Sequence, residues 1–209
     1  MDVALLTFDG VDEIDLVGPF EVFSRARAFV PGLVVRIVSV RGQTDVVGGF
    51  GLRHQADGPL GTTPDLLVVP GGGWISREPR GVRAEIEAGP LTALIADAHA
   101  KGAVVAAVCT GALALAAAGV LANRPATTHR GAIGDLRATG ARIVDAHVVD
   151  DGDVVTCGGV THGIDLALWL VERFFGAEIA QRIGTGLEYT RTTSIWASAA
   201  AIASQPPPP

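Results

Sequence analysis

The fold is decided by the stretch Val104-Val105-Ala106-Ala107-Val108-Cys109-Thr110-Gly111-Ala112-Leu113. An apolar, β-branched run stops at a cysteine, and helix-forming residues follow almost at once. This pattern predicts a buried strand, a sharp turn at Cys109 and a helix. Small residues on either side of the turn, Ala107 and Gly111, allow the close backbone passage that such a turn requires.

The predicted turn favours reactive chemistry at Cys109. Its sulfur would lie above the end of the strand and beside the first free N–H groups of the helix. These groups and the helix dipole favour an anion, which predicts a lowered thiol pKa and a thiolate nucleophile. The alternative is a buried cysteine that fills a small apolar hole. The strand–cysteine–helix arrangement is more specific than a lone cysteine and favours the nucleophile.

Length and composition indicate one soluble domain. The chain has 209 residues, of which 48% are hydrophobic, and we assign residues 1–200 to the domain and 201–209 to a disordered proline-rich tail. A net charge of −6 argues against a nucleic-acid partner. No apolar run approaches the ~20 residues of a membrane span, and no leader segment precedes the first strand. Two cysteines make no disulfide framework, which favours a reducing cytoplasm.

Strands and helices alternate along the chain, which predicts an α/β fold. The strands are continuous apolar runs, typical of a parallel sheet covered on both faces. We therefore expect a single-domain, three-layer α/β/α sandwich with a mostly parallel central sheet of the flavodoxin-like type. The expected strands are 2–8, 33–40, 65–69, 104–108, 126–128 and 142–144, with hairpins over 45–54 and 147–156. The expected helices are 15–28, 90–100, 111–118, 130–138, 161–175 and 177–182.

Three strand ends carry residues suited to a site. They lead to an acidic segment that contains Asp15, to the glycines 71–73, and to Cys109. In a parallel sheet these ends meet at one edge, where sites of α/β proteins lie. The N–H groups of Gly72, Gly73 and Thr110 would then form an anion hole for charge that develops on a substrate. A simple tight turn is the alternative for the glycines.

Five motifs together resemble the ThiJ/PfpI superfamily, whose fold is that of class I glutamine amidotransferases. The resemblance extends from residue 2 to about residue 189, and the chain is most similar to the isocyanide hydratase branch. The motifs are Pro70-Gly71-Gly72, Val108-Cys109-Thr110-Gly111, Glu13-Ile14-Asp15-Leu16-Val17-Gly18-Pro19, Ala126-Thr127-Thr128-His129 and Gly163-Ile164-Asp165.

The resemblance implies a reaction and three catalytic residues. Cys109 would be the nucleophile, Asp15 the general acid and base, and Thr110 a hydrogen-bonding partner. The implied reaction hydrates an isocyanide to an N-substituted formamide through a thioimidate, with no metal and no organic cofactor. The implied assembly is a homodimer. For Asp15 a second reading stays open, because aspartate at the start of a helix is also a good N-cap.

Histidine placement separates branches of the superfamily. Protease-like and chaperone-like relatives carry histidine directly after the nucleophile, whereas Thr110 occupies that position here, which argues against amidase or peptidase activity. His129 is the best placed histidine to approach the pocket, as a structural residue or as a base. Thr161 and His162 are further pocket candidates at the start of a late helix.

Two other functions remain open. One is a carbonyl-stress or redox protein of the same superfamily, similar to glyoxalases or deglycases. The other is a ligand-sensing domain related to arabinose-operon-type regulators, without their DNA-binding part, since about 20 residues after the last motif are too few for a helix-turn-helix pair. Two departures from the hydratase pattern, Arg130 and the segment 187–193, affect the expected pocket rather than the Cys109–Asp15 pair.

Overall fold

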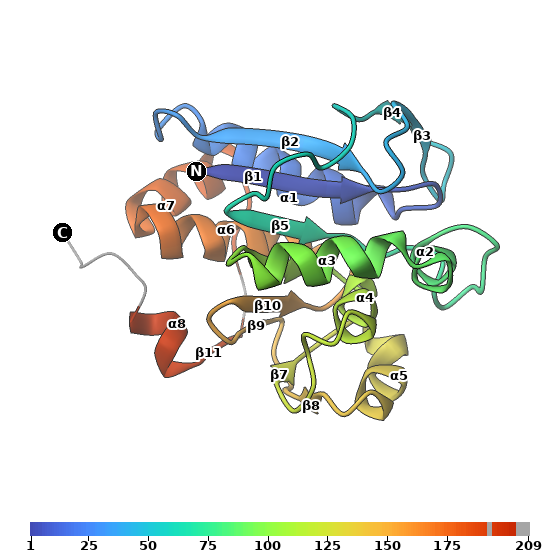
Figure 1. The fold of residues 1–209 in the computed structure, drawn as a ribbon. Coiled ribbons are helices and arrows are strands. Elements are labelled where there is room, and N and C mark those ends of the chain that lie inside the picture. The colour runs from blue at the N-terminus through green and yellow to red at the C-terminus, as the bar shows by residue number, and fades with distance from the viewer. Residues whose placement is uncertain (192–193, 204–209) are drawn as a thin grey trace.

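The computed structural model describes residues 1–191 and 194–203 and is built around one seven-stranded sheet (Figure 1). The strand order is β11-β9-β10-β6-β5-β1-β2, and all neighbouring pairs are parallel except β9 with β10. The predicted fold class is therefore confirmed. The strands are β1 (Asp2–Thr7), β2 (Val34–Ser39), β5 (Leu66–Val69), β6 (Val104–Ala107), β9 (Val148–Asp150), β10 (Val154–Cys157) and β11 (Ile195–Ala197).

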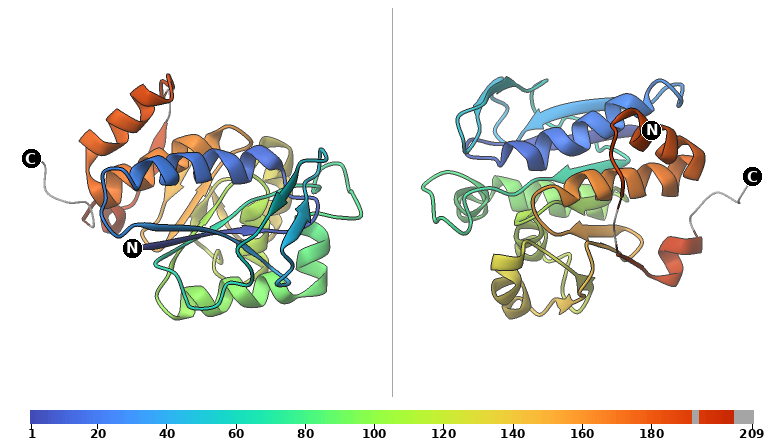
Figure 2. Two further views of the ribbon diagram at one scale, coloured as in Figure 1. Left: turned by 90° about the horizontal axis from the view of Figure 1, so that it is seen from above. Right: turned by 180° about the vertical axis from the view of Figure 1, so that it is seen from behind.

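Helices cover both faces of the sheet, as the two views of Figure 2 show. One layer packs α1 (Glu13–Ala26) against α6 (His162–Phe175) and α7 (Ala177–Gly186). The opposite layer contains α2 (Val82–Ala88), α3 (Pro90–Ala100), α4 (Gly111–Ala117) and α5 (Ile133–Ala138). A short 3-10 turn, η1 (Arg130–Ala132), precedes α5.

The central strands are apolar along their length because both of their faces are covered. All four residues of β5 and of β10 are buried, and so are the last three of β6. An alternating pattern would have left one face in water. This continuous burial fixes the positions of the loops at the carboxyl ends of β1, β5 and β6.

Two small two-stranded sheets lie outside the central sheet. β3 (Asp45–Val47) and β4 (Arg53–Gln55) form the predicted antiparallel hairpin, and β7 (Pro125–Ala126) pairs in parallel with β8 (Arg142–Ile143). Helix α2, strand β11 and the terminal helix α8 (Ala199–Ala203) were not predicted from the sequence. Residues 201–203 of the predicted tail belong to α8, and residues 204–209 lie outside the described residues.

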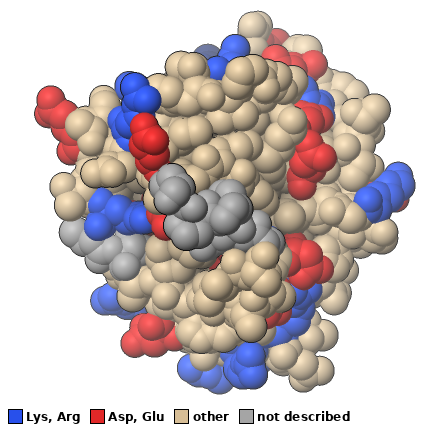
Figure 3. Space-filling view, turned by 90° about the vertical axis from the view of Figure 1, so that its left-hand side faces the viewer, with Lys and Arg blue, Asp and Glu red and all other residues tan. Residues whose placement is uncertain are grey.

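The surface carries no continuous patch of one charge on the face shown in Figure 3. Basic and acidic side chains are interspersed there over a largely uncharged surface. Among the described residues, no helix combines the length and apolar character that crossing a bilayer demands.

Candidate active site

Cys109 occupies a strained turn between β6 and α4, as predicted. Its φ of 56° lies in the left-handed region that residues with a Cβ rarely adopt. The N–H of Gly111 closes the turn on the carbonyl of Val108 at 2.9 Å, and the N–H of Cys109 donates to the carbonyl of Gly158 at 3.1 Å. The sequence thus holds the sulfur at the sheet edge through main-chain bonds, at a backbone conformation found mainly at functional sites.

Asp15 approaches Cys109 from the first layer of helices. It lies inside the first turn of α1 and is fully buried. Its Oδ2 accepts the N–H of Gly71 at 3.0 Å, and the Cys109 thiol is its side-chain hydrogen-bonding neighbour. The N-cap interpretation of Asp15 is wrong, because α1 begins two residues earlier and Asp12 caps it through the N–H of Ile14.

The pKa values of the pair are raised, not lowered. Burial raises the pKa of the Cys109 thiol and the Asp15 carboxylate raises it further, against a lowering by the Thr110 N–H. Burial likewise raises the pKa of Asp15 well above 3.8, and the charge of Asp12 adds to the rise. The predicted low thiol pKa is therefore wrong in direction. Loss of water and a neighbouring carboxylate outweigh the N-terminus of a helix of only seven residues.

The glycine loop after β5 forms hydrogen bonds with Asp15 and with Thr110. The N–H of Gly72 donates to the Thr110 hydroxyl at 3.2 Å, so it is already engaged and the anion hole predicted from Gly72 needs revision. The N–H of Thr110 is directed at the Cys109 sulfur, where it favours negative charge. A Cβ at Gly71 would lie 2.3 Å from Thr110 Oγ1, which explains why glycine is required there.

A cavity of about 460 Å³ opens above Cys109. Apolar side chains form much of its wall, and Asp12, Glu78 and Arg80 bring charge to it. Trp74 is held firmly in this wall, because its Nε1 donates to Asp135 at 2.6 Å and Arg83 covers its ring at 3.8 Å. The lining also includes the predicted site residues Gly72, Gly73, Cys109, Thr110 and His129.

Of the two histidines predicted to approach the pocket, the structure places one at the cavity and the other away from it. His129 does line the cavity, and its Nδ1 accepts the N–H of Gly131 at 3.0 Å. A neutral ring whose Nδ1 accepts carries its proton on Nε2, which makes His129 a donor and favours the structural interpretation. Thr161 and His162 do not line the cavity, so their prediction as pocket residues is wrong. Thr161 precedes α6 and is exposed, whereas His162 begins α6 and packs beside Gly158.

Two features of the site were not predicted from the sequence. The hydroxyl of Thr128 donates to the carbonyl of Cys109 at 2.7 Å, and so fixes the far side of the turn. Gly159 lies against the sulfur, since a Cβ there would approach Cys109 Sγ to 2.8 Å and His129 Cδ2 to 2.5 Å. Thr128 belongs to a motif noticed in the sequence, but its bond to a residue 19 positions away has no local signal.

Glu13 also has a role that the sequence did not reveal. Its Oε1 accepts the N–H groups of Phe50 at 2.8 Å and Leu52 at 3.2 Å. These bonds fix the loop between β3 and β4 beside α1 and bring Phe50 to the cavity mouth. Glu13 therefore shapes the access to the cysteine.

The sequence model of the DJ-1/PfpI family matches residues 1–173. The chain belongs to this family. It is 34% identical over 191 residues to the isonitrile hydratase of Pseudomonas putida, a match that spans 90% of this chain and 78% of the relative. It is also 31% identical over 176 residues to a deglycase of Thermococcus kodakarensis, over 82% of this chain and 96% of the relative.

A solved structure agrees with the family assignment. A ThiJ/PfpI family protein from Pseudomonas syringae superposes with a TM-score of 0.79 at 29% identity. The match covers 91% of this chain and 75% of that protein. Family membership leaves the reaction to be argued from the site.

Proposed function

We propose that this protein is a cysteine-dependent isocyanide hydratase that converts an isocyanide and water to an N-substituted formamide. The observation that carries the proposal is the buried pair of Cys109 and Asp15. One carboxylate oxygen, Oδ2, accepts the Gly71 N–H, and the Cys109 thiol is the side-chain hydrogen-bonding neighbour of the carboxyl. A buried carboxyl of raised pKa is suited to take a proton from the sulfur and to return it to the adduct.

The first step joins sulfur and a proton to the same carbon. The Cys109 proton passes to Asp15, and the carboxyl then delivers it to the terminal carbon of the isocyanide while the sulfur bonds to that carbon. The product is a thioimidate, S–CH=N–R, on Cys109. A soft sulfur nucleophile suits the carbene-like carbon, and the Thr110 N–H stabilises the thiolate as it forms.

The second step returns the enzyme to its starting state. Asp15, now a carboxylate, takes a proton from water as the water oxygen bonds to the thioimidate carbon, and passes this proton to the nitrogen to give S–CH(OH)–NH–R. The C–S bond then breaks, the hydroxyl proton passes to the Cys109 sulfur, and the formamide R–NH–CHO leaves. One carboxyl gives and recovers a proton in turn, which a group of ordinary low pKa would do poorly at neutral pH.

The cavity supports an apolar substituent on the substrate. Phe50, Trp74, Ile75 and Val160 contribute its apolar wall, whereas the isocyanide group itself needs few polar partners. Because Trp74 is held at its Nε1 by Asp135 and over its ring by Arg83, a flat aryl group is a suitable occupant. This supports aryl isocyanides as the first substrates to assay.

A carbonyl-stress role is the second candidate, favoured by the similarity to the deglycase of Thermococcus kodakarensis. It would use the same cysteine on an aldehyde. The decisive test measures purified protein with an aryl isocyanide and, in parallel, with methylglyoxal. Formamide production that is lost in Cys109→Ala supports the hydratase, whereas methylglyoxal consumption without formamide production would replace it by the second candidate.

We also propose a cytoplasmic homodimer. Four large apolar side chains near the start of α1 and the neighbouring loop are exposed: Ile14 (48%), Val17 (43%), Phe50 (88%) and Leu52 (48%). A second copy would cover such a surface favourably. Two buried free cysteines suit a reducing compartment. Light scattering of the purified chain would reveal the dimer, and a monomer at micromolar concentration would contradict it.

A further inference from the structure

A cluster of two histidines and an aspartate lies outside the active-site cavity. His147 directly precedes β9, while His162 and Asp165 stand three residues apart on the first turn of α6, which places them on one helix face. One potential ligand atom from each residue lies within 4.8 Å of the others. None of the three lines the cavity above Cys109.

Each residue of the cluster has one buried polar atom without a hydrogen-bond partner among the described residues. Asp165 is only 2% exposed, yet its Oδ1 is buried with no hydrogen-bond partner among the described residues, and the same holds for Nδ1 of His147 and of His162. A buried carboxylate oxygen without a partner costs free energy that a fold does not normally leave uncompensated. Three such atoms on neighbouring residues favour a shared ligand.

We propose that His147, His162 and Asp165 bind a divalent first-row transition metal, with Zn²⁺ as the best fit. Two imidazoles and a carboxylate form a donor set that suits Zn²⁺ rather than Mg²⁺ or Ca²⁺, which prefer oxygen ligands only. Both histidines are half-buried rather than fully enclosed, which leaves a side open for the fourth ligand of an ion, a water molecule.

The surroundings favour the metal-binding form of the ligands. Burial lowers the pKa of His162, and His147 and Arg130 lower it further against Asp165, which favours the unprotonated imidazole that binds a metal. Tyr189 lies beside Asp165, and burial and this carboxylate raise the pKa of Tyr189 to about 12. Its hydroxyl therefore stays protonated and can orient the carboxylate toward an ion.

Binding requires one rearrangement. The rings of His147 and His162 stack with centroids 4.0 Å apart and planes inclined by 20°. Lone pairs of stacked rings run nearly parallel, so a shared ion must turn one imidazole until the two converge. An ion that bound nonspecifically at the surface would not change this stack.

The expected role is structural support of the nucleophile loop. His162 packs against Gly158, since a Cβ there would lie 2.5 Å from its Nδ1. The carbonyl of Gly158 receives the Cys109 N–H, and its N–H donates to the carbonyl of His147 at 2.9 Å. A metal ion at the cluster would thus tie β9 and α6 together directly behind the loop that holds the cysteine.

The test uses the full chain as Cys109→Ser, which removes the most reactive competing metal ligand. Zn²⁺ affinity is measured by competition with a chromophoric chelator, for this protein and for His147→Gln, His162→Asn and Asp165→Asn made in the same background. His99→Gln is the matched control, because His99 pairs with Asp153 away from the cluster. We expect one Zn²⁺ per chain, and a loss in each ligand variant of at least the ~10–100-fold that removal of a residue orienting a ligand costs. The control should be unchanged.

Two further measurements keep the test decisive if a buried variant does not fold, as circular dichroism would reveal. In histidine NMR spectra, Zn²⁺ should shift the ring signals of His147 and His162 and leave those of His54 and His99 in place. Co²⁺ should give the same weak visible bands with and without Cys109. Absence of Zn²⁺ uptake at micromolar concentration, equal loss in His99→Gln, or a thiolate-to-cobalt band that depends on Cys109 would each overturn the proposal.

Discussion

Thr110 and Gly72 are joined by a hydrogen bond in which the threonine hydroxyl accepts the glycine N–H at 3.2 Å. The bond is buried, and it links the turn after β6 to the loop after β5. Removal of the hydroxyl leaves a buried N–H without this acceptor. Thr110→Val should therefore lower the free energy of unfolding by about 1–3 kcal/mol.

Thr110→Ser is the control for this bond, because it keeps the hydroxyl and loses only a methyl group. Urea unfolding monitored by circular dichroism measures both variants. Equal stability of the valine and serine variants would show that the hydroxyl bond does not support the loop.

Asp15→Asn should make the protein more stable at high pH. A group whose folded pKa is raised stabilises the fold fully below its unfolded value, here 3.8, and loses that contribution as pH rises through the folded pKa. The parent should therefore lose stability relative to the variant as pH increases. Melting temperatures of both proteins at pH 5 and pH 8 test this. The melting temperature of the variant minus that of the parent should increase from pH 5 to pH 8, and a decrease would contradict the assigned direction.

The same substitution should change the titration of the cysteine. The charge of Asp15 and its hydrogen bond both raise the pKa of Cys109, so Asp15→Asn should shift the midpoint of iodoacetamide alkylation to lower pH. Turnover of an aryl isocyanide should nevertheless fall about 10²–10⁴-fold, the usual contribution of a general acid or base. A Cys109→Ser protein corrects for alkylation at other sites. An unchanged midpoint would mean that the two groups are not coupled.

Gly71→Ala should be disruptive despite its small size. The added Cβ would lie 2.3 Å from Thr110 Oγ1 and 2.7 Å from Thr110 N, both inside the packed turn. Overpacking of this kind costs about 1–3 kcal/mol, and here it also displaces the N–H that binds Asp15. Gly134→Ala in α5 is the control, since its Cβ would meet nothing within 4 Å and should stabilise the helix slightly. Similar melting temperatures for the two variants would refute this account.

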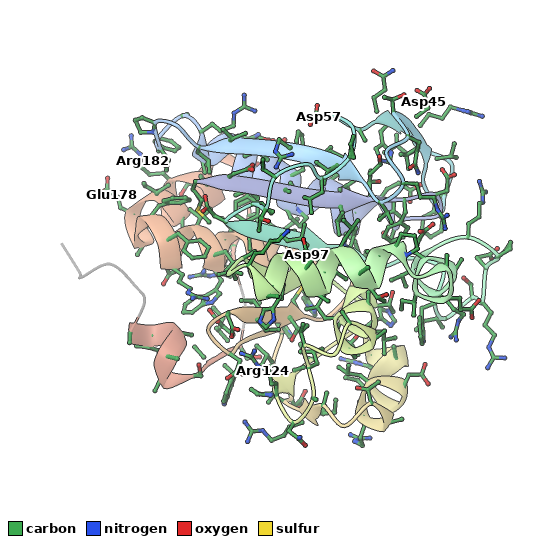
Figure 4. The ribbon with its side chains drawn as sticks, in the orientation of Figure 1. Asp45, Asp57, Asp97, Arg124, Glu178 and Arg182 are labelled. Carbon is green, nitrogen blue, oxygen red and sulfur yellow. The ribbon has the colours of Figure 1, made fainter. Side chains whose placement is uncertain are left out.

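The buried ion pair between Asp150 of β9 and Arg173 of α6 should contribute more to the free energy of unfolding than an exposed ion pair. Asp150 is fully buried, and it accepts Arg173 at 3.0 Å and Trp169 Nε1 at 2.8 Å. Asp150→Ala leaves the Arg173 charge buried without this carboxylate and should cost about 3–5 kcal/mol. Asp97→Ala on α3 removes an exposed partner of Lys101 and should cost less than about 1 kcal/mol (Figure 4). Chemical denaturation of both variants makes the comparison, and equal losses would be inconsistent with it.

Much of the fold was predictable because the core strands are continuous apolar runs with clear stops. The turn at Cys109 and the hairpin over 45–54 follow from local pattern and were placed correctly. Helix α2 was missed because Gly81 and Gly89 bound a segment of only seven residues. Strand β11 was missed because its pairing with β9 is long-range and its own sequence is short.

The meeting of three segments at the sheet edge was predictable from the sequence, but the electrostatics of the site were not. Cys109, Asp15 and the glycine loop meet at the sheet edge because parallel strands end together. The direction of the thiol pKa depends on burial and on the distance to Asp15, which no sequence pattern encodes. The same applies to His162: its position at the start of α6 was evident, but only the packing of α6 turns it away from the cavity and toward His147.

The first turn of α1 carries both Asp15 and Glu13. The former reaches the sulfur, and the latter holds the loop that presents Phe50 at the cavity mouth. Any shift or rotation of this one helix would therefore alter proton delivery and substrate admission at the same time. Redesign of the protein for larger substrates should accordingly begin at Trp74 and Ile75. Smaller side chains there would widen the cavity without moving Asp15.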